Sequence, residues 1–486
     1  MQSKEQPEKI HRHCLEFMQL LNTHSLKNIY FIAICGTGMT ALAGMLKSRG
    51  YAVQGADQNV YPPMSDFLQE LGIPVLQGFS EKHLEPAPDL VIIGNSMSRG
   101  NPEVEAVLDN KIPYMSLPQA LQEFFIRGQY SCVVAGTHGK TTTSSMLTWV
   151  LESSGRDPGF FIGGIPENFG RGFKIGNGGL FVSEGDEYDS AFFDKGSKFL
   201  HYMPDLVILN NIEFDHADIF KDIDAIETAF SRLLNLVPAN GYLVANWDDP
   251  LVKKLSGHVF SKVVTFGLTA GDWRAENIKP GESFTELDVL HKGDLWGTLS
   301  IPLHGNHMVQ NCLAVVAAST VLGLSRGEII DGLGTFKNVR RRLQLVGEAR
   351  DIKIFDDFAH HPTEVTATID GLKSRYCTRR LWAVWEPRTA TSKRNIYQQR
   401  YIESFDNADC VIMAPLHLPE KIPAQERLSL EQVSLALSQK GKPNWIVPAG
   451  SEMIDFLKNN LHSGDVVLFM SNGDFNQTPR KLLKVI

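Results

Sequence analysis

One stretch of the sequence has the residue types that could cradle the phosphates of a nucleotide. It follows the apolar residues 132–134, precedes a helix-like pattern at 144–151, and reads Gly136, Thr137, His138, Gly139, Lys140, Thr141, Thr142. A strand, a glycine-bounded turn and Lys-Thr at the start of a helix surround phosphates with backbone N–H groups. Lys140 would add positive charge and Thr141 a hydroxyl for Mg2+. Only two residues separate the two glycines, where the general pattern has four. We predict phosphate binding here; the alternative is a chance glycine turn.

A second glycine-rich turn has the pattern of a dinucleotide-binding fingerprint. The strand-like residues 29–35 lead into Gly36, Thr37, Gly38 and Met39, and an apolar-periodic helix follows. Asp57, about twenty residues later, stands where an acid would bind a ribose. The apolar residues 90–93 end in a polar loop that contains Asn95 and Ser96. The pattern predicts pyrophosphate binding, or else a turn that only lets helix and strand pack.

Acids and a histidine follow two further apolar runs. The runs are residues 180–183 and 206–209, and the polar residues beyond them are Glu184, Asp186, Asp189, Asn211 and His216. In a domain that has a phosphate loop, such residues are candidates to hold a divalent metal and position a γ-phosphate. The alternative for each is a solvated loop residue.

Later segments add candidates for nucleotide contact. His307 and Asn311 lie four residues apart and so share a helical face, which indicates either a capped helix start or a nucleotide contact. The basic residues 340–342 could form a solvated turn or direct an arginine at phosphate. The strand-like residues 352–355 lead to Asp357 and then to two adjacent histidines at 360 and 361, which on a regular element cannot point the same way.

Composition excludes several classes of protein. The chain has 486 residues and a formal net charge of −8, which argues against a nucleic-acid-binding face. Its six cysteines are scattered without a C-x-x-C pair, as is typical of free thiols in a reducing compartment. No apolar run approaches the roughly 18 residues that span a membrane, and the N-terminus lacks a signal-type apolar segment. We expect a cytoplasmic protein with no nucleic-acid or membrane partner.

Alternation of strand and helix patterns predicts three α/β domains, each with a mostly parallel sheet. These are a Rossmann-like N-terminal domain (1–122), a central P-loop ATP-binding domain (123–340) and a Rossmann-like C-terminal domain (341–486). Further strands are expected at 381–385, 410–414, 445–447 and 466–470, and a short helix around Phe17, Leu20 and Leu21.

Taken together, the motifs resemble those of the three-domain, ATP-dependent Mur ligases of bacterial cell-wall synthesis. The resemblance rests on seven motifs in the family's order: residues 36–39, 136–142, 184–187 and 211–216, His307 with Asn311, the pair 341–342, and residues 356–363. One departure is Met308, since the family commonly has asparagine after the histidine. A lysine at the family's carbamate position is not evident either.

The resemblance implies a role for each candidate residue. ATP and Mg2+ would be the cofactors, with Lys140, Glu184, His216 and Asn211 catalytic and with Thr141, Glu184 and His216 at the metal. The ATP-binding residues would be 136–142 with His307, Asn311, Arg341, Arg342, Asp357 and His360. A UDP-sugar would lie at Gly36, Thr37, Gly38, Met39, Asp57, Asn95 and Ser96.

Within the family, the chain resembles the branch that uses UDP-N-acetylmuramate and joins to it the murein tripeptide L-alanyl-γ-D-glutamyl-meso-diaminopimelate. Residues 186–195, 213–220 and 385–388 carry this resemblance. Arg388 would bind an acidic group of the peptide, unless it is a surface arginine after Pro387. The alternatives are the L-alanine-adding ligase and a nucleotide-binding regulatory protein without ligase activity. The intact set of Lys140, Glu184 and His216 argues against the latter.

Overall fold

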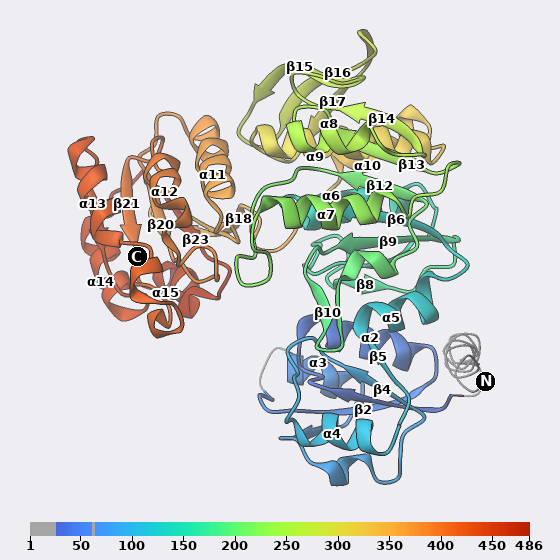
Figure 1. The fold of residues 1–486 in the computed structure, drawn as a ribbon. Helices are drawn as coiled ribbons and strands as arrows, with labels where there is room; N and C mark the ends of the chain where they lie inside the picture. Colours follow the sequence, from blue (N-terminus) through green and yellow to red (C-terminus); the bar gives the residue numbers. More distant parts are fainter. Residues whose placement is uncertain (1–25, 61–63) are drawn as a thin grey trace. The chain divides into compact units, whose positions relative to one another are not determined.

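The computed structural model describes residues 26–60 and 64–486, so the helix predicted around Phe17 lies outside the described residues. The chain forms two compact units (Figure 1). The first comprises the described residues up to Gly128 together with the segment Asp189–Gly196, and the second comprises Gln129–Tyr188 with Ser197–Ile486. The predicted central and C-terminal domains therefore belong to one unit.

The first unit is built on a five-stranded parallel sheet with the order β3-β2-β1-β4-β5. Its strands are β1 (Asn28–Ile32), β2 (Ala52–Asp57), β3 (Val75–Gln77), β4 (Leu90–Ile93) and β5 (Tyr114–Ser116). Its helices are α2 (Thr37–Ser48), α3 (Met64–Glu70), η2 (Glu81–Leu84), α4 (Pro102–Asp109), α5 (Leu117–Leu121) and the π-helical turn η3 (Gln122–Ile126). The central strand β1 is buried after its first residue, as expected of a parallel sheet with both faces covered.

A hairpin from much later in the sequence completes this unit. It consists of β10 (Asp189–Ala191) and β11 (Asp194–Ser197). The Phe193 ring packs edge-on against Tyr114 of β5 with a centroid separation of 4.9 Å, and Phe192 also packs on the core of the unit. Apolar contact thus attaches residues that follow the acidic motif 184–187 to the first unit.

The second unit contains a ten-stranded sheet with the order β17-β16-β15-β14-β13-β12-β6-β9-β7-β8. Its strands are β6 (Tyr130–Ala135), β7 (Gly159–Phe161), β8 (Phe173–Lys174), β9 (Leu180–Gly185), β12 (Leu206–Leu209), β13 (Tyr242–Asn246), β14 (Lys262–Phe266), β15 (Trp273–Pro280), β16 (Thr285–His291) and β17 (Asp294–Ile301). Strands β14 to β7 run parallel, whereas β8 and the β15–β17 meander pair antiparallel. The prediction of a mostly parallel sheet is corrected here to a mixed one. The meander escaped prediction because one face of β15 is exposed, so it has no continuous apolar run.

Helices cover the parallel part of this sheet. They are α6 (Lys140–Ser153), η4 (Lys198–His201), α7 (Ile223–Leu234), α8 (Pro250–Ser256), α9 (Asn306–Val321) and α10 (Arg326–Gly334). α6 and α9 are buried along most of their length and pack in one core with the strands. α6, which begins at the phosphate loop, and α9, whose second residue is His307, are thereby held rigidly.

A six-stranded sheet forms the C-terminal part of the second unit, with the order β18-β19-β23-β20-β21-β22. Its strands are β18 (Gln344–Ala349), β19 (Ile352–Asp357), β20 (Leu381–Trp385), β21 (Cys410–Met413), β22 (Asn444–Ile446) and β23 (Val466–Met470), and only β18 is antiparallel. Its helices are α11 (Pro362–Arg375), η5 (Asn395–Tyr397), α12 (Gln398–Ser404), η6 (Pro419–Lys421), η7 (Ala424–Glu426), α13 (Leu430–Gln439), α14 (Ser451–Asn460), η8 (Phe475–Gln477) and α15 (Thr478–Leu483).

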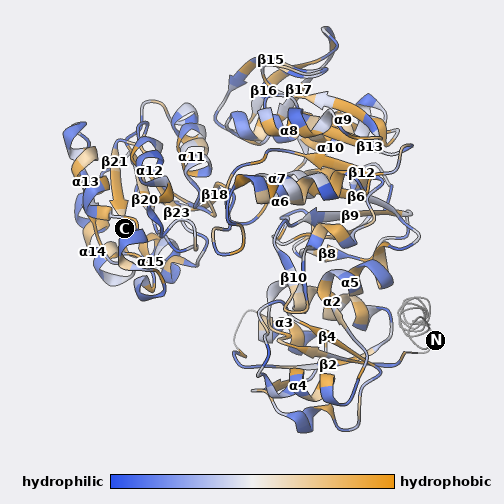
Figure 2. Cartoon of the chain, in the orientation of Figure 1, coloured by the Kyte–Doolittle hydropathy of each residue, from blue (hydrophilic) through white to orange (hydrophobic). Residues whose placement is uncertain are grey.

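The arrangement confirms the predicted fold class of three α/β sheets, with the central one mixed. Figure 2 shows apolar residues concentrated in the strands and polar residues on the outer helix faces. Among residues 26–60 and 64–486, no helix combines the length and the apolarity needed to cross a bilayer.

Candidate nucleotide and phosphoryl-transfer site

The phosphate loop joins β6 to α6 through two glycines that a side chain could not replace. Gly136 and Gly139 have φ of 133° and 80°, which favour glycine. A Cβ on Gly139 would lie 2.8 Å from Oδ1 of Asn311, and one on Gly136 would lie 3.0 Å from the backbone nitrogen of Asn211. The phosphate loop therefore packs closely against Asn211 and Asn311. Gly139 is the N-cap of α6.

Lys140 lies in the first turn of α6 with its charge buried and fully paired. Its Nζ donates to the carbonyls of Gly136 (2.8 Å) and Thr137 (3.2 Å) and to Oε2 of Glu187 (2.8 Å). Burial opposes the charged form, but the nearby carboxylates outweigh it and raise the pKa of Lys140. Lys140 is thus a permanent cation at the phosphate loop.

The next residue, Thr141, pairs with the predicted metal-binding acid. Its hydroxyl donates to Oε1 of Glu184 at 2.5 Å, and Oε2 of the same carboxylate accepts from the backbone N–H of Gly163 at 2.7 Å. Burial and the charge of Asp186 raise the pKa of Glu184. Mg2+ prefers oxygen ligands. The buried carboxylate of Glu184 and the adjacent hydroxyl of Thr141 therefore form a suitable pair of Mg2+ ligands.

Glu187 connects Lys140 to His216. Oε1 of Glu187 lies 3.3 Å from Nε2 of His216. Burial opposes ionisation of Glu187, yet Lys140 and His216 lower its pKa to about 2; burial likewise opposes protonation of His216, yet Glu187 raises its pKa. His216 has a φ of 53°, an uncommon left-handed conformation that other contacts must stabilise. The sequence motif contained Glu187, but nothing in the spacing indicated this role.

The side chain of Asn211 forms two hydrogen bonds with the phosphate loop. Its Oδ1 accepts from the backbone N–H of His138 at 2.7 Å, and its Nδ2 donates to the carbonyl of His138 at 3.2 Å. The side chain therefore fixes the conformation of the phosphate loop.

A cavity of about 330 Å³ opens beside the phosphate loop. It is lined by predicted residues from both sequence halves of the second unit: His138, Gly139, Thr142, Asn211, His307, Asn311, Arg342 and Asp357. His307 and Asn311 do share one face of α9, and Met308 also lines the cavity. Burial, aided by Arg342, lowers the pKa of His307 to about 4, so its imidazole is neutral.

The two predicted arginines have different environments. Arg341 donates from Nε to Asp356 at 3.1 Å and from Nη2 to the carbonyls of Ser471 (2.6 Å) and Gly473 (2.5 Å). These contacts hold it within the C-terminal sheet. Arg342 instead lines the cavity, so its guanidinium is the better placed of the two for nucleotide contact.

Asp357 and His360 also have contrasting positions. Asp357 lines the cavity at the end of β19 and accepts from the backbone N–H groups of Leu343 (2.6 Å) and Ala359 (2.7 Å). Burial raises its pKa to about 6. His360 is turned elsewhere, with Nδ1 3.0 Å from the carbonyl of Phe358 and Nε2 3.9 Å from Asp215.

Side chains after β20 hold the segment that carries His216, which sequence reasoning did not foresee. The hydroxyl of Tyr397 donates to the carbonyl of Phe214 at 2.6 Å, and Oγ1 of Thr391 accepts from the backbone N–H of Ala217 at 3.3 Å. Because these pairs are more than 170 residues apart, no local pattern could have indicated them.

In the first unit, the fingerprint residues lie at the carboxyl edge of the sheet. Gly36 precedes α2, which begins at Thr37, while Asp57 ends β2 and the exposed Asn95 and Ser96 follow β4. Oδ2 of Asp57 accepts from the backbone N–H of Cys35 at 2.9 Å, which ties β2 to the turn. Since β2, β1 and β4 are neighbours, all the predicted UDP-sugar residues share this edge.

Arg388 lies in the loop that follows the carboxyl end of β20. Its Nη1 is 3.7 Å from Oε2 of Glu386, and its side chain packs on Gly473. With 29% of the side chain exposed, the guanidinium is accessible.

Fold and site together define a nucleotide-binding α/β protein with a buried cation, a hydroxyl–carboxylate pair and a histidine around one phosphate loop. Three family descriptions match the chain in succession: "Mur ligase family, catalytic domain" at residues 28–129, "Mur ligase middle domain" at 134–319 and "Mur ligase, glutamate ligase domain" at 341–473. The chain belongs to the Mur ligase family, whose members are ATP-dependent ligases that form amide bonds.

Three relatives illustrate the position of the chain within this family. It is 43% identical over 458 residues to the UDP-N-acetylmuramate–L-alanyl-γ-D-glutamyl-meso-2,6-diaminoheptandioate ligase of Escherichia coli, covering 94% of this chain and 97% of the relative. It is 32% identical to the UDP-N-acetylmuramate–L-alanine ligase of Clostridium acetobutylicum, covering 92% and 95%. The crystal structure of a murein peptide ligase from Psychrobacter arcticus matches with a TM-score of 0.69 and 35% identity, covering 94% and 98%.

Proposed function

We propose that this protein joins the tripeptide L-alanyl-γ-D-glutamyl-meso-diaminopimelate to the lactyl carboxylate of UDP-N-acetylmuramate with ATP, in peptidoglycan recycling. The observation that carries the proposal is the set of Lys140, Thr141, Glu184 and His216 around the phosphate loop. The 43% identity to a ligase named for these substrates supports the choice of peptide. The free thiols of Cys35, Cys132, Cys312, Cys377 and Cys410 are in keeping with a cytoplasmic location.

The first step would transfer the γ-phosphoryl group of ATP to the lactyl carboxylate and form an acyl phosphate and ADP. Such a transfer depends mainly on positioning and charge neutralisation. Lys140 would neutralise charge on the β- and γ-phosphate oxygens, where its buried ammonium is held by Glu187. Thr141 and Glu184 would hold one Mg2+ and His216 a second. Mg2+ supplies charge neutralisation at the phosphate oxygens.

In the second step, the free amine of the tripeptide would attack the acyl carbon. Phosphate would then leave from a tetrahedral intermediate as the amide bond forms. Arg388 would bind a carboxylate of the incoming peptide, because a guanidinium matches a carboxylate in shape and charge. Asp357 would bind the ATP ribose, with Arg342 and His307 beside the nucleotide. The first unit would bind the UDP part at Gly36–Met39, Asp57, Asn95 and Ser96.

Phosphate release from ATP tests the proposal directly. The assay contains Mg2+ and UDP-N-acetylmuramate, and receives either the tripeptide or L-alanine. We expect strong stimulation by the tripeptide and little by L-alanine, and R388A should raise KM for the tripeptide more than KM for ATP. Stimulation by L-alanine alone would identify the second candidate, which the 32% identity to L-alanine ligases supports. No stimulation of phosphate release by either acceptor would reject ligase activity.

A further inference from the structure

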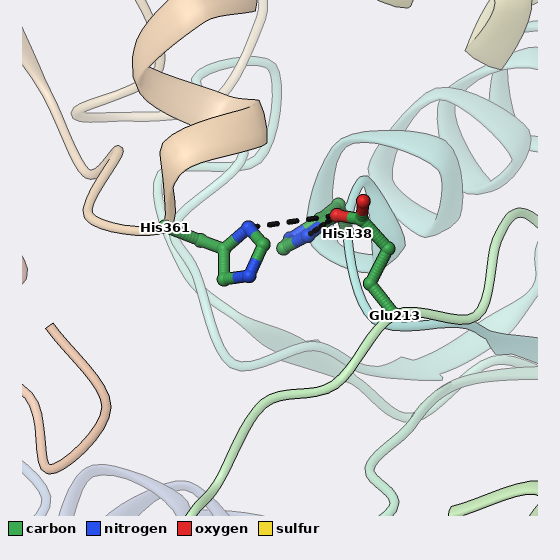
Figure 3. Close-up of side chains that lie close together, drawn as sticks. All are labelled: His138, Glu213 and His361. Atoms are coloured by element: carbon green, nitrogen blue, oxygen red, sulfur yellow. Dashed lines mark hydrogen bonds and ion pairs between the residues drawn. The ribbon is translucent and has the colours of Figure 1, made fainter. Parts of the chain in front are cut away.

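Three metal-ligating side chains converge outside the set of Thr141, Glu184 and His216. They are His138 of the phosphate loop, Glu213 after β12 and His361, the N-cap of α11. One ligand atom from each lies within 4.8 Å of the others. Figure 3 shows the two imidazole rings and the carboxylate pointing toward one another from three separate segments.

Two of the three ligand separations are close to those of a tetrahedral metal site. Oε2 of Glu213 is 2.9 Å from Nε2 of His138 and 3.5 Å from Nδ1 of His361. Zinc–nitrogen bonds of about 2.0–2.1 Å place neighbouring tetrahedral ligands about 3.3 Å apart. These two distances lie on either side of this value, and the ligand atoms of His138 and His361 are within 4.8 Å of each other.

The ligands are shielded and chemically available. The side chain of His361 is fully buried, and those of His138 and Glu213 are 11% and 26% exposed. Among residues 26–60 and 64–486, Nε2 of His361 has no hydrogen-bond partner, and its Nδ1 accepts a long 3.4 Å bond from the backbone N–H of Thr363. The lone pair of Nδ1 is therefore engaged only by a long hydrogen bond, while the ring packs edge-on against Tyr397 with a centroid separation of 4.8 Å.

The surrounding charges favour a cation at this point. Glu213 and Glu364 approach the two ring nitrogens of His138 at 2.9 Å and 3.3 Å. A metal ion could take the place of the proton on His138 between these two carboxylates, which Arg400 and Arg342 also approach, at 3.2 Å from Glu213 and 3.8 Å from Glu364. The hydroxyl of Thr363, 2.6 Å from Oε2 of Glu213, lies close enough to complete the shell.

We propose that His138, Glu213 and His361 bind a borderline transition-metal ion such as Zn2+, with the fourth position open to Thr363 or water. Imidazole nitrogens suit zinc, cobalt and nickel, whereas Mg2+ prefers oxygen ligands. The bound ion links the phosphate loop to the start of α11 and fixes the loop in the observed conformation. Metal binding at this site does not depend on the ligase reaction, so it can be tested independently of the proposed function.

Zinc binding to the intact chain tests this site. Metal bound after equilibrium dialysis with Zn2+ is measured in excess Mg2+, which saturates oxygen-rich sites, and Co2+ serves as a spectroscopic probe of coordination. We expect one zinc per chain, tetrahedral cobalt bands, and an affinity at least about tenfold lower in both H361N and E213Q. The matched control is H304N, which changes another buried histidine outside the cluster and should bind zinc as the wild type does.

Thermal melting without metal checks that each variant is folded, and added Zn2+ should raise the Tm of the wild type and of H304N but not of the two site variants. If either H361N or E213Q does not fold, the zinc affinity of the other variant tests the proposal. The proposal is overturned if the wild type binds no zinc, if folded H361N or E213Q binds it as tightly as the wild type, or if H304N lowers the affinity equally.

Discussion

The ammonium nitrogen of Lys140 lies 2.8 Å from Oε2 of Glu187, and the other oxygen of that carboxylate lies 3.3 Å from Nε2 of His216. One buried carboxylate therefore orients both the ammonium group and the imidazole of the phosphoryl-transfer site. Because Glu187 touches the two groups proposed to act on the γ-phosphate, we regard it as the main positioning residue of the site.

Replacing Glu187 with glutamine tests that role. The neutral amide holds the ammonium group of Lys140 and the imidazole of His216 less firmly, so we expect kcat for ATP-dependent phosphate release to fall by about 100-fold with a smaller change in KM for ATP. Steady-state kinetics measure both constants. The control is E227Q, which removes a surface partner of Lys254 and should leave both unchanged. Wild-type kinetics in E187Q would show that the contacts of Lys140 with Gly136 and Thr137 suffice.

The neighbouring arginines provide a matched pair of substitutions. R342A removes a guanidinium that lines the nucleotide cavity, so we expect KM for ATP to rise about tenfold. R341A removes donors to Asp356 and two backbone carbonyls, so we expect a lower Tm with little change in KM. Kinetics and thermal melting of both variants separate the two effects. The reverse pattern would contradict this assignment.

The pKa of Asp357 predicts how nucleotide affinity depends on pH. Burial raises this pKa from 3.8 to about 6, so the carboxylate is ionised above pH 6 and becomes protonated as the pH falls through that value. A protonated carboxyl is a poorer acceptor for ribose hydroxyl groups. We expect KM for ATP to rise as the pH falls from 7 to 5, and D357N to have a high KM without this dependence. An identical pH profile in D357N would assign the effect to another group.

The pKa of His138 predicts a loss of stability at alkaline pH. Burial opposes protonation, but Glu213 and Glu364 raise the pKa of His138 from 6.5 to about 9 in the folded protein. A raised pKa stabilises the fold fully below pH 6.5, and this contribution is lost as the pH rises through 9. The shift corresponds to about 3 kcal/mol at most.

Thermal melting of the metal-free protein between pH 6 and pH 10 measures this effect. We expect the Tm of the wild type to fall across the interval, and the fall to be smaller in H138Q. H258Q replaces an exposed histidine and should retain the wild-type profile. Equal slopes in all three proteins would show that another group causes the loss.

Continuous apolar runs were the reliable signal for strands. The runs 206–209, 381–385 and 466–470 coincide with β12, β20 and β23, because both faces of a central parallel strand are buried. The β15–β17 meander was missed because polar residues occupy its exposed positions. These polar residues interrupt the apolar run that would have indicated a strand. The hairpin Asp189–Gly196 could not be assigned to the first unit from sequence, since only the packing of Phe192 and Phe193 places it there.

The sequence by itself determined the phosphate loop, its lysine and threonine, the acid near the end of one buried strand and the histidine that follows another. It could do so because these residues occupy fixed offsets from a strand end, where local geometry dictates their positions. Only the tertiary structure decided that Arg342 rather than Arg341 lines the cavity and that Glu187 joins Lys140 to His216. It alone brought His138, Glu213 and His361 together. Their contacts join segments that are distant in sequence, and such contacts depend on how the elements pack rather than on any local spacing.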